Sequence, residues 1–170
     1  MPRPIKIGVS ACLLGEQVRY DGGHKHDRYI TDTLGKYFTL VPVCPEVGCG
    51  LPTPREAMQL EGDPAAPHLM TRLSRVDKTE QMLEYCASKA GELEQEGLCG
   101  FIFKERSPSC GLSAVPLHGH GSSETFTTGL FAKKIACNFP LIPLVEAERL
   151  NDPAIRENFI KSVLNSLESP

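Results

Sequence analysis

The chain has 170 residues, a formal net charge of −3 and no tryptophan, and 41% of its residues are hydrophobic. This length and composition predict a single domain, residues 1–170, with an ordinary hydrophobic core rather than a disordered chain. The slight negative charge excludes a broad cationic face of the kind that holds nucleic acid. The longest apolar runs are far shorter than the roughly 20 residues of a membrane helix. We therefore expect neither stable nucleic-acid binding nor membrane insertion.

The first half of the chain predicts two short apolar strands, with loops and a helix around them. In chain order these elements are a buried strand at 5–10, a polar loop at 15–27, a short helix at 27–37, a strand at 39–43, a Gly/Pro-rich loop at 48–54 and a peripheral extended segment at 69–75.

Residues 77–95 give the clearest helix of the sequence. Apolar residues recur there at the three-to-four spacing of a buried stripe, with Asp77 as N-cap and Gly97 as the stop. The stripe consists of Met82, Leu83, Cys86, Ala90 and Leu93.

The remaining elements continue an alternation of strands and helices. They are a strand at 99–104, a loop at 107–113, a polar, glycine-rich segment at 118–128, a helix at 129–138, a strand at 141–145 and a terminal helix at 152–167. Asp152 and Pro153 suit the N-cap and N1 positions of the last helix. The alternation predicts an α/β fold: an open, mostly parallel, Rossmann-like sheet with helices on both faces.

Seven cysteines stand in the chain, at positions 12, 44, 49, 86, 99, 110 and 137. An odd number does not suit a closed disulfide framework. Only about five residues separate Lys6 from Cys12, too few for the apolar region of a signal peptide. We therefore expect a cytoplasmic protein whose thiols stay reduced, where unusual cysteines bind metal, do chemistry or pack in the core.

Three of the cysteines follow predicted strands. Cys12 comes after the first strand, Cys44 after the second, and Cys110 lies in the loop after the third. In an open parallel sheet, ligands bind beyond the carboxyl ends of the strands. These three residues are therefore candidate metal ligands, although their spacing alone does not decide between metal binding and packing.

The other cysteines have different surroundings. Packing is favoured for three of them: Cys86 lies on the apolar face of a helix, Cys99 opens a buried strand and Cys137 ends an amphipathic helix. Cys49 forms a C-x4-C pair with Cys44, a spacing that also occurs in iron–sulfur proteins. The absence of paired CxxC motifs disfavours a closed structural zinc site.

Several polar residues are candidates for further roles. Lys104, Arg106 and Arg19 could favour thiolates, and Arg55 could bind a polar or anionic substrate. The alternative for Arg55 is a solvated surface charge. His24 and His26 lie in a polar loop and suit a solvated surface better than a metal pair.

Several motifs lie around these residues. In order they are Ser10-Ala-Cys12-Leu-Leu-Gly15, Val18-Arg-Tyr-Asp-Gly22, Cys44-Pro-Glu46, Pro52-Thr-Pro-Arg55, Lys104, Ser107-Pro-Ser-Cys-Gly111, Gly129-Leu-Phe and Asn151-Asp-Pro-Ala-Ile-Arg-Glu-Asn158. Taken together, these motifs resemble those of the bacterial domain-of-unknown-function family 523, which includes the thiouracil desulfidases. The resemblance covers nearly the whole chain.

The resemblance implies a [4Fe-4S] cluster held by Cys12, Cys44 and Cys110. It also implies that the fourth iron, free of protein, binds the sulfur of a thiolated pyrimidine such as 2- or 4-thiouracil. Uracil and hydrogen sulfide would be the products, with Glu46 and Ser107 as the catalytic residues. Three cysteines fit such chemistry because they leave one metal position open.

Alternatives remain open at several of these residues. Ser109, like Ser107, could bind a pyrimidine carbonyl or water, or could cap the following turn. Cys49 departs from the family pattern, and as a fourth ligand it would close the open iron. The substrate could be a free base, a nucleoside or a modified RNA base, and the net negative charge of the chain makes intact RNA the least favoured of these.

The resemblance also extends to members with a second domain. The rival from another class is a non-catalytic iron–sulfur or zinc-binding module, such as a redox sensor.

Overall fold

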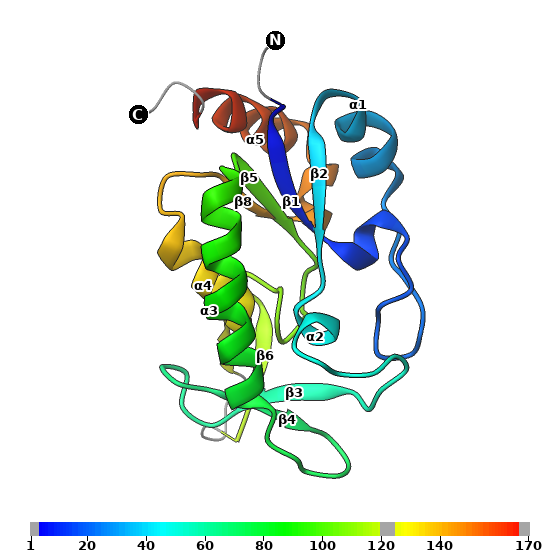
Figure 1. Cartoon of the computed structure of the whole chain (residues 1–170), viewed down its shortest axis with the longest axis vertical. Coiled ribbons are helices and arrows are strands. Elements are labelled where there is room, and N and C mark those ends of the chain that lie inside the picture. The colour runs from blue at the N-terminus through cyan, green and yellow to red at the C-terminus, as the bar shows by residue number, and fades with distance from the viewer. Residues whose placement is uncertain (1–3, 120–124, 167–170) are drawn as a thin grey trace.

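The computed structural model describes residues 4–119 and 125–166, and this part of the chain contains two four-stranded sheets. The first sheet has the strand order β2-β1-β5-β8, and all its strand pairs are parallel (Figure 1). β1 is flanked by β2 on one side and β5 on the other, so the chain changes direction across the sheet at β1. The strands are β1 (Lys6–Ser10), β2 (Thr39–Val43), β5 (Gly100–Phe103) and β8 (Leu144–Glu146).

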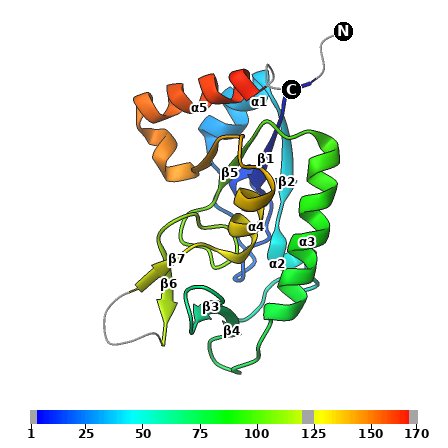
Figure 2. The ribbon, with the colours of Figure 1, turned by 90° about the vertical axis from the view of Figure 1, so that its left-hand side faces the viewer.

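Helices cover both faces of this sheet. Figure 2 shows α3 on one side of the strands and α5 on the other. Phe101 and Phe103 pack in the core under α3 and α4, while Ile7 and Ile102 pack in the core under α5. The fold class expected from the sequence is therefore confirmed. The helical elements are 3₁₀ segments at Ala11–Leu14 and Ala147–Asn151, a π-helical segment at Tyr29–Leu34, α1 (Gly35–Tyr37), α2 (Pro45–Gly48), α3 (Thr79–Glu96), α4 (Leu130–Asn138) and α5 (Pro153–Ser166).

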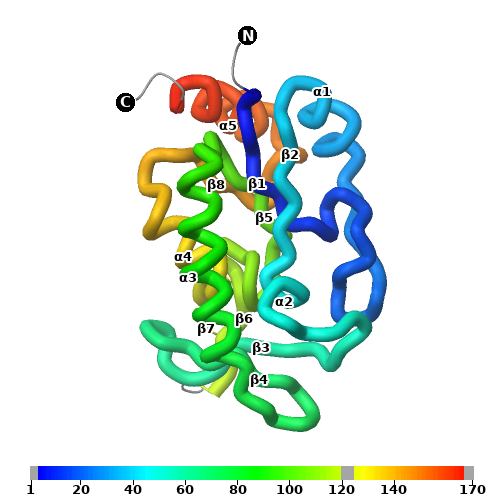
Figure 3. The backbone as a smooth tube through the Cα atoms, in the orientation of Figure 1, coloured from blue at the N-terminus to red at the C-terminus, as the bar shows by residue number. Residues whose placement is uncertain are grey.

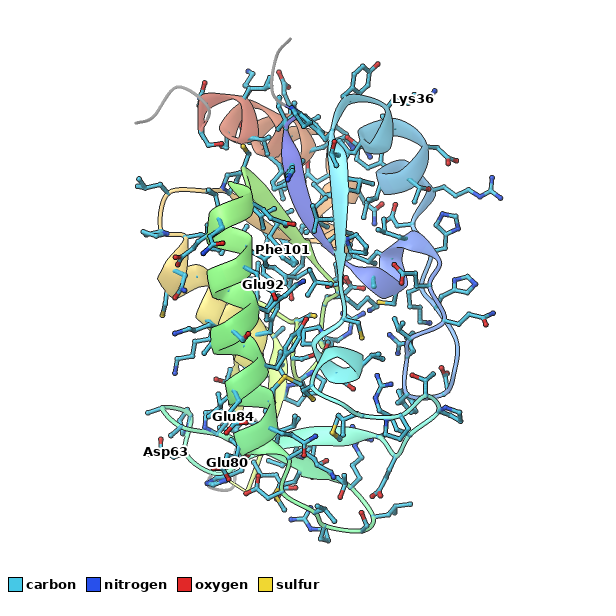
Figure 4. All side chains as sticks on the ribbon, viewed as in Figure 1. Lys36, Asp63, Glu80, Glu84, Glu92 and Phe101 are labelled. Carbon is cyan, nitrogen blue, oxygen red and sulfur yellow. The ribbon has the colours of Figure 1, made fainter. Side chains whose placement is uncertain are left out.

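The centre of the sheet depends on close packing of aromatic rings. Phe101 and Phe103 stack with their ring centroids 4.3 Å apart, and Figure 4 shows Phe101 beside α3. A Cβ atom on Gly8 would lie 2.3 Å from the Phe101 ring, so β1 needs glycine where this ring crosses it. The opposite face of α3 is charged, with Glu80 and Glu84 exposed.

The second sheet has the order β4-β3-β6-β7 and lies below the first in Figure 1. Leu60, Leu69 and Leu117 of this sheet join the core under α3 and α4. The sequence predicted only one extended segment here, at 69–75, and missed the other strands because each is too short to show a clear alternation. The strands are β3 (Met58–Glu61), β4 (His68–Thr71), β6 (Val115–His118) and β7 (Thr125–Thr127).

Several predicted helix features are confirmed and others are wrong. Gly97 ends α3 in the left-handed conformation, and the Asp152 carboxylate accepts the N–H of Ala154 at the start of α5. Lys78, not Asp77, occupies the N-cap of α3, although Asp77 accepts the N–H of Thr79. Leu83 is half exposed, because it lies about 100° around the helix from Met82.

The three cysteines expected in the core have different environments. Cys86 and Cys99 are buried, as predicted, but Cys137 is exposed. Cys137 lies about 200° around α4 from the buried Ile135, so its side chain faces solvent. Parts of two predicted segments, 118–128 and 152–167, lie outside the described residues. No helix of the described residues is long and apolar enough to cross a membrane.

Candidate active site

A cavity of about 400 Å³ lies past the carboxyl ends of β1, β2 and β5. Its lining includes Cys12, Cys44 and Cys110, which the sequence places far apart. Residues of α2 and of the segment entering β3 complete the wall. The structure therefore brings the three strand-end cysteines into one cavity, at the place where parallel sheets bind ligands.

The three thiols are close enough to influence one another. Cys12 and Cys110 are buried, Cys44 is half-buried, and none of them forms a disulfide. Burial raises the pKa of all three thiols, and for Cys110 the neighbouring Cys12 and Cys44 raise the pKa further. These effects favour the neutral thiol form of all three cysteines.

Groups that stabilise thiolates surround the same sulfur atoms. Arg19 and Lys104 oppose the effect of burial on the pKa of Cys12. The Ser10 and Ser109 hydroxyls do the same for Cys110, and the Ser109 Oγ lies 3.8 Å from the Cys110 Sγ. Because metal binding deprotonates cysteine, this donor set fits a group that carries positively charged iron.

Three cysteines around one cavity suit an iron–sulfur cluster, because each cysteine binds a different iron there. Among the described residues, no group of three or more His, Cys, Asp or Glu side chains is placed to hold a single metal ion.

The loop that carries Cys110 is fixed from two sides. The Ser107 Oγ accepts hydrogen bonds from the backbone N–H groups of Ser109 (3.3 Å) and Cys110 (3.1 Å). The first N–H groups of α4 donate to the loop, from Leu130 to the Pro108 carbonyl at 3.1 Å and from Phe131 to the Ser109 carbonyl at 3.0 Å. The start of α4 thus sets the position of Cys110.

Gly129 allows this close approach. A Cβ atom at this position would lie 2.6 Å from the carbonyl carbon of Ser109. We expect Gly129→Ala to displace the Cys110 loop and to lower the iron content of the anaerobically purified protein several-fold. The matched control is Gly91→Ala in α3, where an added Cβ meets nothing within 4 Å. Equal iron contents in the two variants would contradict the role given to Gly129.

Glu46 lies in α2, two residues after Cys44, and both of its carboxylate oxygens are engaged. Its Oε1 accepts a hydrogen bond from the Arg55 Nε at 3.0 Å, and its Oε2 accepts one from the Ser109 Oγ at 3.2 Å. The side chain is only 13% exposed. The carboxylate is therefore held between Arg55 and the Cys110 loop, at the cavity wall.

The two serines connect Glu46 with the rest of the loop. The Ser107 Oγ and the Ser109 Oγ are 3.1 Å apart. Ser109 has one hydroxyl proton, for which the Glu46 carboxylate and the Cys110 sulfur compete. Ser107 caps the turn, one of the two alternatives that the sequence left open, and it still lines the cavity.

Arg55 lines the cavity but is deeply buried, with its side chain 6% exposed. Besides Glu46, its guanidinium donates to the Val18 carbonyl at 2.8 Å, the Pro52 carbonyl at 3.2 Å and the Thr53 Oγ1 at 3.2 Å. Its backbone N–H donates to the Tyr20 carbonyl at 2.7 Å. Figure 3 shows the loop after β1 running beside the segment that leads into β3. The contacts of Arg55 with Val18 and Tyr20 join the two.

Cys49 lies away from this centre. It is not among the residues that line the cavity, and its sulfur donates to the Glu46 carbonyl at 3.3 Å. It packs against the core near α3. His24 and His26 are exposed, in keeping with the solvated loop expected from the sequence.

Some cavity residues escaped the sequence analysis. Lys25 and Arg72 line the cavity with no motif to single them out as functional, and Ser10 lines it although the motif that contains it gave it no role. Ser10 is the polar last residue of an apolar strand and is 2% exposed, and its Oγ accepts the Lys104 N–H at 3.0 Å. The signal for Ser10 that the sequence offered was a polar residue at the end of a buried strand. Lys104 and Arg106, expected near the thiols, also pair with Glu105 and Glu148 respectively.

The fold and the cavity define an open-sheet α/β protein with a three-cysteine site. Residues 7–147 match the model of the 2-thiouracil desulfurase family. The chain belongs to this family, which confirms the resemblance found in its motifs and makes the protein a desulfurising enzyme.

Two known proteins are similar to the chain. A solved structure, the [4Fe-4S]-dependent thiouracil desulfidase TudS, has a TM-score of 0.71 and 30% sequence identity, covering 91% of this chain and 98% of its own. The uncharacterised protein YbbK of Bacillus subtilis is 33% identical over an alignment of 110 residues, and the match covers 62% of this chain and 72% of YbbK.

Proposed function

We propose that the protein is a [4Fe-4S]-dependent desulfidase that removes sulfur from thiolated pyrimidines such as 2- or 4-thiouracil, with uracil and hydrogen sulfide as products. The observation that carries this proposal is the cavity that three unbridged cysteines share with Glu46 and Ser107. Cys12, Cys44 and Cys110 would hold the cluster. The family and the similarity to TudS support the same reaction.

When bound, the cluster would supply an iron without a protein ligand, a Lewis acid with affinity for the substrate's sulfur. The chain's own residues then move the protons. Water adds at the carbon that bears sulfur, and Glu46 accepts a proton from that water and returns one as the sulfur leaves. Ser107 and Ser109 hold the water or a ring carbonyl by hydrogen bonds. One thiopyrimidine and one water thus give one uracil and one hydrogen sulfide.

The same site supports a proposed compartment and substrate size. All seven cysteines, each within the described residues, are free thiols, which supports a cytoplasmic location. The cavity of about 400 Å³ would be shared with the cluster, which favours a small substrate such as a thiolated base or nucleoside.

Turnover of the protein purified without oxygen tests the proposal. We expect sulfide and uracil to appear in equal amounts from 2-thiouracil or 4-thiouracil, with 4-thiouridine as the nucleoside probe. An iron-loaded protein that releases no sulfide from any of the three would overturn the proposed function and favour a non-catalytic iron–sulfur module.

A further inference from the structure

The geometry points to Arg55 as a positioning residue, one that fixes the carboxylate of Glu46 and does not bind the substrate. This inference rests on the proposed function, in which Glu46 moves protons during sulfur removal. It also differs from the substrate-binding role that the sequence suggested for Arg55.

The guanidinium of Arg55 is committed to protein partners. It donates to Glu46, to the carbonyls of Val18 and Pro52 and to the hydroxyl of Thr53. Glu46 is the only acidic side chain paired with it among the described residues. An arginine buried to this extent needs both its charge and its donors satisfied. The contacts within the described residues use four of its five N–H donors, so most of its hydrogen-bonding capacity is directed at the protein rather than at a substrate.

Arg55 is itself held in place. Its main-chain N–H donates to the Tyr20 carbonyl. Its guanidinium joins Val18, in the loop after β1, to Pro52, three residues before Arg55. The Val18 carbonyl that accepts from Arg55 also lies 4.0 Å from the Cys44 Sγ. The guanidinium is therefore fixed relative to a proposed cluster ligand as well as to Glu46.

Two opposed contacts then orient the carboxylate. Arg55 holds Oε1 and Ser109 holds Oε2 of Glu46. A glutamate side chain has three rotatable bonds, so without Arg55 the carboxylate would keep one contact and turn about it. Misplacing a reacting group by 1 Å costs about 100-fold in rate. Removing the positioning residue should therefore lower kcat and leave substrate affinity unchanged.

A double-mutant cycle on the iron-loaded protein separates the two roles. We expect Arg55→Met to lower kcat by 10- to 100-fold with KM within about twofold, and to cost little more when Glu46 is already Gln. Arg55→Lys keeps the positive charge but lacks the planar guanidinium with its several donors. Its kcat should lie between those of the wild type and Arg55→Met. An equal rise in KM in both the Glu46 and the Gln backgrounds would overturn the inference and assign Arg55 to the substrate.

The matched control is Arg75→Met, which breaks an Arg–Glu pair with Glu61 outside the cavity. It should leave kcat and KM unchanged. Iron content is measured for every variant, so that loss of the cluster is recognised as such.

Crystal structures of Arg55→Met and Arg55→Lys give a readout that needs no activity. We expect the Glu46 carboxylate to leave its position between residue 55 and Ser109 in Arg55→Met and to stay near it in Arg55→Lys. An unmoved carboxylate in Arg55→Met would overturn the inference. A wild-type protein without desulfidase activity would instead overturn the proposed function, while the position of Glu46 in these structures would still decide the role of Arg55.

Discussion

Cys110→Ala is expected to yield a colourless protein with little iron and no desulfidase activity. Cys110 is 5% exposed and shares the cavity with the other two cysteines, which both raise the pKa of its thiol. With alanine at this position only Cys12 and Cys44 remain as thiolate donors in the cavity, and two ligands leave half of a cluster's irons without protein. Iron analysis and the visible spectrum of the anaerobically purified variant measure the effect.

Two other cysteines serve as controls for this variant. Cys86 is buried in the core. Cys49 donates to the Glu46 carbonyl but is not among the residues that line the cavity. Cys86→Ala and Cys49→Ala should both retain the iron content of the wild type. If Cys49→Ala lost iron as completely as Cys110→Ala, Cys49 would be a fourth ligand. The iron proposed to bind substrate would then have no coordination position open for it.

Glu46→Gln is expected to lower kcat by about 10²- to 10⁴-fold while the iron content stays that of the wild type. Glutamine keeps the shape of the side chain, and its carbonyl can still accept from the Arg55 Nε. Its amide cannot take up a proton from the attacking water. Sulfide release under saturating 2-thiouracil measures the loss.

A second glutamate provides the comparison. Glu61 is also paired with an arginine, Arg75, but lies outside the cavity, so Glu61→Gln should leave kcat unchanged. A Glu46→Gln protein within a few-fold of the wild-type rate would show that Glu46 does not move protons in the reaction.

Local sequence patterns predicted the parts of the fold that they control. A continuous β-branched, apolar run located β1, of which nearly every residue is buried, and the three-to-four spacing of the apolar stripe located α3. The convergence of Cys12, Cys44 and Cys110 was predictable as well, because residues that follow parallel strands meet at one edge of a sheet.

The second sheet and the contacts within the site depend on residues distant in sequence. β3 pairs with β6, more than 50 residues later, and neither strand has more than four residues. The contact between Ser109 and Glu46 spans 63 residues and arises only when α4 and α2 are both in place. No local pattern predicts such contacts, so the burial of Arg55 and its pairing with Glu46 were likewise not predictable from the sequence.

The metal content of the wild-type protein tests the central claim most directly. Purified without oxygen, it should be brown and contain iron and acid-labile sulfide in equal amounts, and both should disappear when Cys12, Cys44 and Cys110 are replaced together by alanine. A colourless wild-type protein that contains zinc and no iron would contradict the assignment of these three cysteines to an iron–sulfur cluster.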